Sequence, residues 1–432
     1  MKLLIFSPVT VSSAIGRVTG LVVQALAAQG HEVVIVRSED TSRVEATTHA
    51  LGAKIVRWDD AYRVKAVAET ADAVVYQMGN NYEFHCGCLE WLPKLPGIVC
   101  LHDYFLGGLF HGWAASREHQ AKAVLQAWYG DDVANRYFSY RDSAQFIEAT
   151  FETAPLTEWV ASMAHGVLTH SSWSIDRVLD SCPGPVCVVP LPYDAPKPGR
   201  PQSTGDPDAS AAEFTVLTLG HINPNKRADS VIRAIAESPR LRDVTLYRLV
   251  GRIEPAVEEH LTSLADGLGV RLAISGEVSD AVLQEALGKA DVVCCLRLPA
   301  LEAASASAIE AMLYAKAVIV MDTGFYQELP DAYVRKVSPQ REIQDLRAEL
   351  DALYVDPGQR RALGLGAAEW AEQTFRADNY AERLTGFCTM VAEAAPAVRA
   401  SRFYAELLAR WGASKDLLPA TDIVSLLRPL GR

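Results

Sequence analysis

The first hundred residues alternate short apolar runs with longer amphipathic stretches. Residues 3–6 and 31–36 are rich in leucine, isoleucine and valine, whereas residues 16–29 repeat apolar side chains at helical spacing. Further apolar runs of strand length follow at 54–57, 73–77 and 98–101. Strands that alternate with helices predict a parallel sheet covered by helices on both faces.

The same alternation returns in the second half of the chain. Strand-like apolar runs lie at 214–219, 244–250, 271–274, 292–295 and 317–321, with helical patterns at 228–237 and 305–315 between them. Residues 194–212 are crowded with proline, glycine and serine, a composition typical of a linker. The pattern therefore predicts two doubly wound α/β domains, at 1–193 and 213–375. Ligands of such sheets bind beyond the carboxyl ends of the strands, so we expect a cleft there.

The end of the chain is helical in pattern. Residues 357–394 predict helices, and a tail after Pro396 places Phe403, Leu407, Leu408 and Trp411 at helical spacing. An amphipathic helix packs its apolar side on a neighbour. We expect residues 376–432 to form helices that pack back on the N-terminal domain.

Composition narrows the class of protein. The 432 residues are 49% hydrophobic and 22% charged, as in a soluble globular protein, and the formal net charge is −12. A strongly acidic chain is unsuited to general nucleic-acid binding, which needs a basic face. No apolar run reaches the roughly 18 residues that a membrane span requires. Peripheral association with a membrane stays open. Pro8 interrupts a start that resembles a signal peptide, so we expect a cytoplasmic protein.

Metal and redox motifs are weak. The eight cysteines form no C-x-x-C pair and are expected to be reduced thiols. The sequence Asp206-Pro-Asp208 has the spacing of a metal-binding pair, but it falls in the proline-rich linker rather than at a strand end. His85-Cys-Gly-Cys88 has no second ligand pair at a usual spacing. We therefore expect neither a metal nor a cofactor.

Two glutamates, Glu302 and Glu310, frame a run of small residues between the apolar run 292–295 and the following helix. The first lies on the predicted loop and the second inside the helix. Small residues allow the backbone N–H groups at the helix start to approach an anion. Flanking carboxylates accept hydrogen bonds from sugar hydroxyls. This arrangement suits a nucleotide-sugar, although two solvated glutamates on a surface helix would have the same spacing.

A second motif follows the first apolar run of the second half. Gly220 permits a tight turn, and Lys226 comes just before the helix at 228–237. A lysine at the mouth of a strand places a positive charge where a diphosphate would lie. The alternative is a lysine near a helix start whose ammonium group reaches solvent.

Together the two motifs, in this order, resemble those of the retaining GT-B glycosyltransferases of glycosyltransferase family 4. The segments 274–280 and 317–324 match as well, so the likeness covers nearly the whole second half. The first half agrees more loosely, through residues 79–81, His85 and 101–104. The resemblance implies a GT-B fold, in which two Rossmann-like domains face a central cleft and helices end the chain.

The resemblance implies roles for residues of the second half. Lys226 would bind the donor diphosphate, and Glu310 would hold the ribose hydroxyls. Glu302 would face the sugar ring and assist the positive charge that develops at its anomeric carbon. Residues in backbone reach of the donor would be Val278, near the base, and Ala304, Ser305 and Ala306 at the helix start.

One departure from the family pattern concerns the charge at the phosphates. The residue after Gly220 is usually arginine in the family, but here it is His221. A neutral imidazole would halve the formal positive charge unless His221 is protonated or Arg227 substitutes. We count both among the donor-binding candidates.

In the first half, His102 is the candidate for a group near the reacting centre. Asp103 is placed to orient its imidazole, and a histidine satisfied within the core is the alternative. Gly16, on the loop after the first strand, would approach the phosphates from the opposite domain. Asn80, His85 and Asp103 are expected on the acceptor side.

The expected function is transfer of a hexose from a UDP- or GDP-sugar to a glycan, lipid-linked or small-molecule acceptor, with retention, as in polysaccharide biosynthesis. Two alternatives stay open. One is a sugar-nucleotide epimerase or hydrolase of the same architecture. The other is a non-catalytic protein that binds a glycan or nucleotide, which His221 and the altered loop after Glu302 keep in play. An NAD-dependent dehydrogenase is disfavoured because the glycine fingerprint is absent.

Overall fold

The computed structural model describes residues 1–43, 45–194 and 213–412. The chain forms two compact units, one of residues Met1–Pro190 with Ala377–Arg432 and the other of residues Leu191–Arg376. Asp206, Asp208, most of the predicted linker and the end of the tail lie outside the described residues. Each unit has its own parallel sheet.

The first unit contains a parallel sheet of seven strands in the order β3-β2-β1-β4-β5-β6-β7. These strands are β1 (Lys2–Ser7), β2 (Glu32–Arg37), β3 (Lys54–Arg57), β4 (Ala73–Met78), β5 (Ile98–Leu101), β6 (Gly166–Thr169) and β7 (Val186–Val188). β1 is buried over five of its six residues, as expected for a strand covered on both faces.

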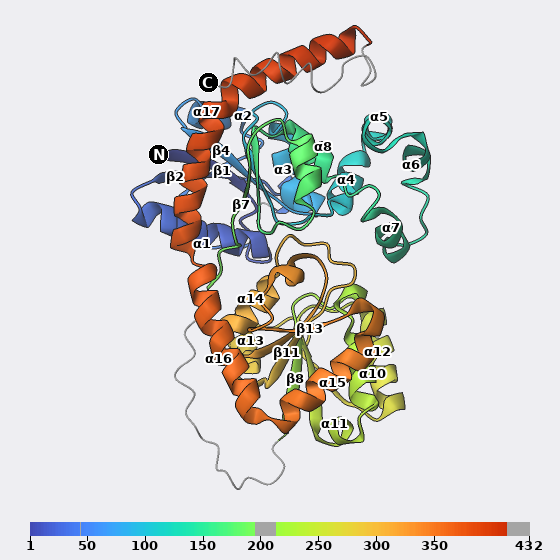
Figure 1. Cartoon of the computed structure of the whole chain (residues 1–432). Coiled ribbons are helices and arrows are strands. Elements are labelled where there is room, and N and C mark those ends of the chain that lie inside the picture. The colour runs from blue at the N-terminus through green and yellow to red at the C-terminus, as the bar shows by residue number, and fades with distance from the viewer. Residues whose placement is uncertain (44, 195–212, 413–432) are drawn as a thin grey trace. The chain divides into compact units, whose positions relative to one another are not determined.

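Helices cover this sheet and extend beyond β5. They are α1 (Ala14–Ala28), α2 (Ala61–Ala68), α3 (Tyr82–Trp91), α4 (Gly107–Ala114), α5 (Glu118–Tyr129), α6 (Asp131–Arg136), α7 (Ser143–Thr150), α8 (Thr157–Met163), α9 (Ile175–Ser181) and α17 (Ala377–Arg410), with a short 3₁₀ helix η1 at Thr41–Arg43. Helix α17 lies beside α1 in the first unit (Figure 1).

The second unit contains a parallel sheet of six strands in the order β10-β9-β8-β11-β12-β13. The strands are β8 (Phe214–Leu219), β9 (Thr245–Val250), β10 (Arg271–Ile274), β11 (Val292–Cys295), β12 (Ala317–Met321) and β13 (Arg335–Val337). Strands β8, β11 and β12 are buried at every position, so they form the centre of the core.

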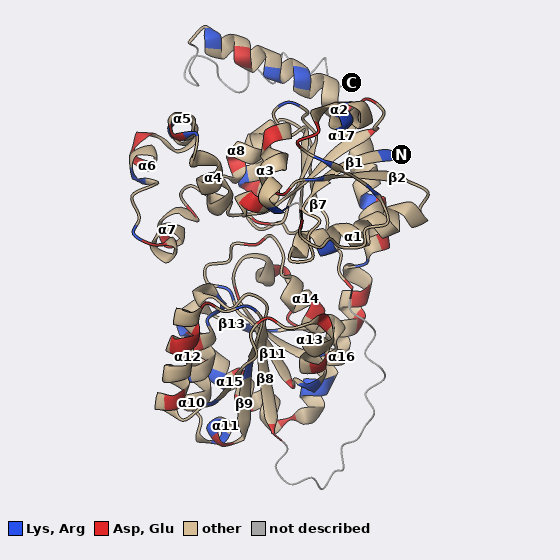
Figure 2. Ribbon diagram, turned by 180° about the vertical axis from the view of Figure 1, so that it is seen from behind, with Lys and Arg blue, Asp and Glu red and all other residues tan. Residues whose placement is uncertain are grey.

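The helices of the second unit carry most of its charged side chains, whereas the strands are mostly free of them (Figure 2). These helices are α10 (Ala228–Ala236), α11 (Pro239–Val244), α12 (Pro255–Leu268), α13 (Asp280–Lys289), α14 (Ala306–Leu313), α15 (Glu342–Val355) and α16 (Pro357–Thr374). Three 3₁₀ helices accompany them, η2 (Pro224–Lys226), η3 (Gly324–Glu328) and η4 (Pro339–Arg341). The apolar faces of α10, α12 and α15 pack against the buried strands in one hydrophobic core.

The prediction of two doubly wound parallel sheets is confirmed. One feature of the helical end was predicted wrongly, because the tail was expected to begin at Pro396. The structure ends α16 at Thr374 and then continues α17 through Pro396 to Arg410. Val391 and Val398, on either side of this proline, are both buried in the first unit. Tertiary packing on both sides therefore holds the helix across a residue that would otherwise interrupt it.

Two loops of the second unit approach each other at backbone distance. A Cβ atom on Gly251 would lie 2.1 Å from the carbonyl oxygen of Gly220, and Gly251 has a φ of +135°. The amide of Gly220 donates to the carbonyl oxygen of Val250 at 2.9 Å, and that of Gly251 to Gly276 at 2.8 Å. Backbone hydrogen bonds thus join the loops that follow β8, β9 and β10, and the approach of Gly251 to Gly220 leaves no room for a side chain at Gly251.

We expect Gly251→Ala to lower the free energy of unfolding of the second unit by about 1–3 kcal/mol, because the new methyl group meets a fixed carbonyl in a left-handed region of φ. Chemical denaturation followed by circular dichroism measures this. The matched control is Gly288→Ala in α13, where a Cβ atom meets nothing within 4 Å. That helical substitution should be neutral or stabilising by up to about 1 kcal/mol. Equal stabilities of the two variants would contradict the prediction.

Candidate functional site

The carboxyl ends of β8 and β11 lie side by side at the centre of the second sheet. From β8 the chain builds β9 and β10 on one side, and from β11 it builds β12 and β13 on the other. A reversal of this kind is a topological switch point, where ligands of parallel α/β sheets bind. The loops that begin at Gly220 and at Leu296 both start at this point.

The loop after β8 buries a lysine. Gly220 turns the chain with a φ of +88°, and Lys226 then ends the 3₁₀ helix η2 with only 4% of its surface exposed. The ammonium group donates a hydrogen bond to the carbonyl oxygen of Leu219. Burial lowers the pKa of Lys226 well below its usual value, and the nearby charge of Arg297 lowers it further. The folded chain therefore holds this cation against an unfavourable environment.

The loop after β11 buries a second cation, Arg297, which is 6% exposed. Its Nε atom lies 3.1 Å from Oε1 of Glu302, whose side chain is 35% exposed. Burial raises the pKa of Glu302, but the charge of Arg297 and its hydrogen bond outweigh burial, so the net shift is downward. The ion pair thus keeps Glu302 ionised at neutral pH and fixes its position.

Helix α14 begins beside these charges. Ser305 caps the helix by accepting a hydrogen bond from the amide of Ala308 at 3.3 Å, and the first turn contains no acidic residue. The hydroxyl of Ser307 lies 3.6 Å from the position of a Cβ atom on Gly220, and Nζ of Lys226 lies 2.7 Å from the same point. The helix start and the lysine therefore face one small region.

Glu310, the second predicted glutamate, lies inside α14 and is 5% exposed. The hydroxyl of Tyr193 donates to its Oε2 atom at 3.3 Å. Glu302 and Glu310 therefore occupy the loop and the helix, respectively, that the sequence pattern predicts for them.

Other predicted donor residues lie around the same strand ends. The side chain of His221 is largely exposed, but its ring is partly desolvated. This partial burial lowers the pKa of His221, and the charges of Arg252 and Lys226 lower it further, so the imidazole is neutral at pH 7. Arg227 forms a bidentate ion pair with Glu342, with Nη2 to Oε2 at 2.7 Å and Nε to Oε1 at 2.9 Å. Val278 lies half-buried in the loop between β10 and α13. Of the cations predicted here, Lys226 is the buried one, and Arg227 is already engaged by a carboxylate.

Ala304 and Ser305 are buried, and Ala306 opens α14. The sequence therefore predicted the position of the helix start. It did not single out Arg297. A basic residue two positions after a fully apolar strand, and five before Glu302, was the signal that could have identified it.

In the first unit, His102 follows β5 and is 9% exposed. Its Nε2 atom lies 2.6 Å from Oε1 of Gln77, and its ring centroid lies 4.7 Å from that of His170. Burial lowers the pKa of His102 well below its usual value, and His170 and His85 lower it further. The imidazole is therefore neutral and is positioned by the Gln77 amide.

Asp103, which was predicted to orient His102, forms a hydrogen bond with the loop after β4. Its Oδ2 atom accepts a hydrogen bond from the amide of Asn80 at 2.7 Å. Asn80 in turn accepts at Oδ1 from the amides of Gly108, at 2.7 Å, and Leu109, at 3.1 Å. These two acceptor-side candidates thus join the loop after β4 to the first turn of α4.

His85 and Gly16 complete the predicted residues of the first unit. His85 is buried in α3, and burial lowers its pKa to about 3. Gly16 was expected on the loop after β1, but it lies in the first turn of α1, where its amide donates to Oγ of the capping residue Ser13 at 3.1 Å. A Cβ atom there would lie 2.9 Å from the carbonyl oxygen of Pro8. The helix therefore begins earlier than predicted.

Within the described residues, no group of histidine, cysteine, aspartate and glutamate side chains is arranged to hold a metal ion. No helix in that part of the chain is both long enough and apolar enough to span a membrane.

Comparison with known proteins adds a family and a fold. Residues 203–370 match the family model described as glycosyl transferases group 1. A comparison with curated proteins gives no match.

Several solved structures share the architecture of the chain. Sucrose-phosphate synthase from Thermosynechococcus elongatus superposes with a TM-score of 0.60 at 16% identity, covering 90% of this chain and 98% of the other. Anabaena HepE in complex with UDP-glucose superposes with a TM-score of 0.59 at 17% identity, covering 90% of this chain and 99% of HepE. WaaG, a glycosyltransferase involved in lipopolysaccharide biosynthesis, superposes with a TM-score of 0.55 at 18% identity, covering 89% of this chain and 100% of WaaG. At these identities the likeness establishes the fold.

The family match and the fold agree on the second unit, where the buried cations and both predicted glutamates lie. The chain therefore has the GT-B fold, and residues 203–370, most of which lie in its second unit, match the glycosyl transferases group 1 model.

Proposed function

We propose that the chain is a retaining glycosyltransferase that moves a sugar from a UDP- or GDP-sugar to a carbohydrate or small-molecule acceptor. The observation that carries the proposal is Lys226, a buried lysine at the carboxyl ends of β8 and β11 that forms no ion pair with the described residues. Lys226 and Arg297 are 4% and 6% exposed, and Glu302 is paired with Arg297, whereas Lys226 donates to the carbonyl oxygen of Leu219. Buried charges are stable when they are paired, so this site favours an anionic ligand.

A diphosphate supplies the missing negative charge. Lys226 would donate to its oxygens, and the free N–H groups at the start of α14 would contribute the positive end of the helix dipole. A charge-assisted hydrogen bond of this kind contributes roughly 1.5–3 kcal/mol. The absence of an acidic residue from the first turn of α14 leaves that helix end open to an anion.

The two glutamates would bind the rings on either side of the diphosphate. Glu310, held by the hydroxyl of Tyr193, would accept hydrogen bonds from the ribose hydroxyls. Glu302 would face the transferred sugar, where its negative charge stabilises the positive charge that develops at the anomeric carbon. Arg297 is then a positioning residue, because it keeps Glu302 ionised and in place.

The bond changes of a retaining transfer balance without an enzyme nucleophile. The bond between the anomeric carbon and the diphosphate oxygen breaks, and a bond from the acceptor oxygen forms on the same face. The acceptor proton passes to the departing phosphate oxygen. His102, neutral and hydrogen-bonded to Gln77, would position hydroxyl groups rather than act as the sole base.

The solved structures support a uridine nucleotide as the first donor to test. HepE is described in complexes with UDP, with UDP and glucose, and with UDP-glucose. The family model and the fold are also consistent with the glycosyl-transfer class as a whole.

One observation favours a second candidate, a protein that binds a nucleotide without turnover. His221 is neutral, and Arg227 is engaged by Glu342, so Lys226 would face the phosphates with little help from either. Tight binding of UDP together with no transfer or hydrolysis of UDP-sugars would support this candidate.

We expect Lys226→Met to abolish the increase in melting temperature that UDP produces in the wild-type chain, since the ammonium group contacts the diphosphate. Without nucleotide, the same variant should be more stable by on the order of 1 kcal/mol, because a buried charge is removed. Thermal shift with UDP, GDP and ADP measures both effects. The control, Lys289→Met, removes an exposed lysine that pairs with Glu285 on α13 and should leave both unchanged. A folded wild-type chain indifferent to all three nucleotides would contradict the proposal.

Substitutions of the two glutamates should separate binding from chemistry. Glu310→Gln should weaken UDP binding by about tenfold, because a charged hydrogen-bond acceptor for ribose is lost. Glu302→Gln should lower turnover by about tenfold or more with UDP affinity within about twofold of wild type, because its charge acts on the reacting sugar. Calorimetry with UDP and steady-state release of UDP from UDP-sugars measure these effects. Wild-type behaviour of both variants would show that the assignments are wrong.

Arg297→Gln should change the pH dependence of turnover. Arg297 lowers the pKa of Glu302, whereas burial raises it. Without the arginine only the effect of burial remains, so the pKa of Glu302 rises and the carboxylate becomes protonated at a higher pH. The acidic limb of the pH profile of kcat should therefore move to higher pH. The control is Arg252→Gln, which removes an exposed arginine paired with Glu254 at 2.9 Å. An acidic limb at the same pH in both variants would exclude this role of Arg297.

A further inference from the structure

The chain enters the second unit at Leu191 and leaves it after Arg376. Tyr193 therefore lies at the point of entry, and Phe375 lies at the point of exit. The amide of Tyr193 donates a hydrogen bond to the carbonyl oxygen of Phe375 at 2.9 Å. A backbone contact thus joins the two ends of this unit and fixes the main chain at Tyr193.

Phe375 is itself held in place by packing. It follows α16, its side chain is buried, and its ring lies 5.4 Å from that of Trp370 at an interplanar angle of 89°. Its amide donates to the carbonyl oxygen of Ala371 at 2.9 Å, which continues the helical hydrogen bonding of α16. Tyr193 is therefore attached to the end of a packed helix.

Helix α16 in turn packs closely on the end of α14, the helix that contains Glu310. A Cβ atom on Gly364 of α16 would lie 2.1 Å from the carbonyl oxygen of Ala315, two residues after α14 ends at Leu313. No side chain fits between the two backbones at this point. The separation between α14 and the end of α16, and with it the position of Tyr193 relative to Glu310, is thus set by backbone contacts.

The side chains of Tyr193 and Glu310 meet across this arrangement. The hydroxyl of Tyr193 donates to Oε2 of Glu310 at 3.3 Å, and Glu310 is 5% exposed, whereas Tyr193 is half-buried. Water could serve a half-buried hydroxyl equally well, so folding alone does not require this bond. The bond restricts rotation of the carboxylate. An ionised carboxylate accepts about four hydrogen bonds, so a bond from Tyr193 is compatible with others from a ligand.

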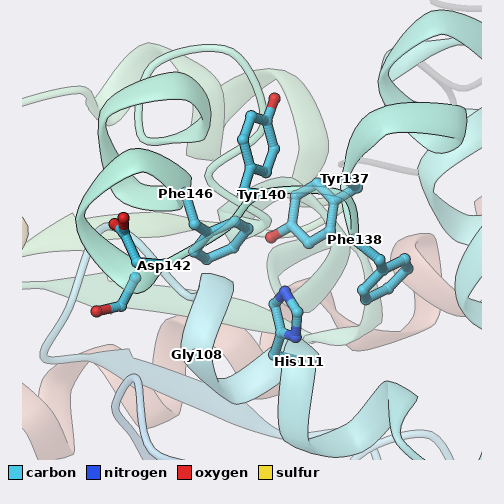
Figure 3. A pocket seen from close by; sticks show the side chains of 8 residues that line it. Gly108, His111, Tyr137, Phe138, Tyr140, Asp142 and Phe146 are labelled. Atoms are coloured by element: carbon cyan, nitrogen blue, oxygen red, sulfur yellow. The ribbon is translucent and has the colours of Figure 1, made fainter.

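Tyr137 of the first unit is a tyrosine whose hydroxyl has no such partner. The hydroxyl is buried and forms no hydrogen bond with the described residues. In Figure 3 it points toward Phe146, and the two rings lie 5.1 Å apart at an interplanar angle of 87°. Aromatic packing accounts for the orientation of Tyr137. The hydroxyl of Tyr193 is instead directed at an acidic side chain.

We propose that Tyr193 is a positioning residue of the donor site, which directs the carboxylate of Glu310 toward the ribose and so makes the chain select ribonucleotides. The proposal rests on the proposed function, because that function assigns the ribose hydroxyls to Glu310. It adds a residue that no strand end supplies, since Tyr193 belongs to the segment through which the chain enters the second unit.

The test compares UDP with 2′,3′-dideoxy-UDP, which lacks both ribose hydroxyls, by isothermal titration calorimetry on the full chain. GDP and its dideoxy analogue take their place if the chain binds GDP alone. Wild type should bind UDP about tenfold or more tightly than the analogue. Tyr193→Phe should lower this preference by about three- to tenfold, the range expected for one hydrogen bond, and leave affinity for the analogue within about twofold of wild type. An unchanged preference, or an equal loss of affinity for both nucleotides, would overturn the proposal.

Two other tyrosines provide controls. The ring of Tyr333 stacks on Trp370 at 5.6 Å and 21°, so Tyr333→Phe removes a hydroxyl next to the same aromatic group that holds Phe375. Tyr137→Phe removes a buried hydroxyl that has no partner among the described residues. Both variants should keep the preference of wild type for UDP. A loss in either control as large as that in Tyr193→Phe would exclude a specific role for Tyr193.

A double substitution shows whether Tyr193 acts through Glu310. In a chain that already carries Glu310→Ala, Tyr193→Phe should change UDP affinity by less than about twofold, because the group that it positions is absent. Equal losses with and without Glu310 would contradict the proposal. Thermal unfolding shows that each variant is folded. UDP binding with an unchanged preference in Tyr193→Phe refutes the role of Tyr193 alone, whereas a folded wild-type chain that binds no nucleoside diphosphate refutes the proposed function on which this role rests.

Discussion

The centre of the second sheet buries a lysine, Lys226, that has no ion pair among the described residues. Lys226 and Arg297 end up buried beside one another because β8 and β11 are neighbours at the centre of the sheet, and the loop after each strand brings in its own cation. Burial penalises both charges, and Glu302 offsets only part of that penalty. A chain selected for stability alone would replace Lys226 with an apolar residue. In the proposed function, an anionic ligand would offset this cost.

The first unit contrasts with this arrangement, because near its strand ends buried imidazole and amide groups gather beside one carboxylate, that of Asp103. His85, His102 and His170 are all buried, and burial lowers the pKa of each. Neutral imidazoles and the Gln77 amide offer hydrogen bonds without adding charge of their own. Such a surface suits uncharged hydroxyl groups, just as the strand ends of the second unit suit a phosphate.

Much of the fold could be predicted because strands buried on both faces are continuous apolar runs in the sequence. The run at 292–295 is β11, and the run at 317–321 is β12. The strands β7 and β13 have three residues each, too few to give a periodic signal. Pro396 misled the prediction because its cost is local, whereas the burial of Val391 and Val398 that offsets it is tertiary. Arg297 was missed for a related reason, since its burial is tertiary and the signal in the sequence is only its spacing from β11 and from Glu302.

The first unit is assembled from two separate segments of the chain, with the second unit inserted between them. Helix α17 supplies buried side chains such as Phe387 to the first unit, and its Arg402 donates to the carbonyl oxygens of Ser162 and Ala164. During synthesis, the ribosome therefore releases the whole inserted unit before the last helix of its host exists. The inserted unit is free to reach its native state as one continuous piece, whereas its host stays open along the α1 surface until translation is nearly complete.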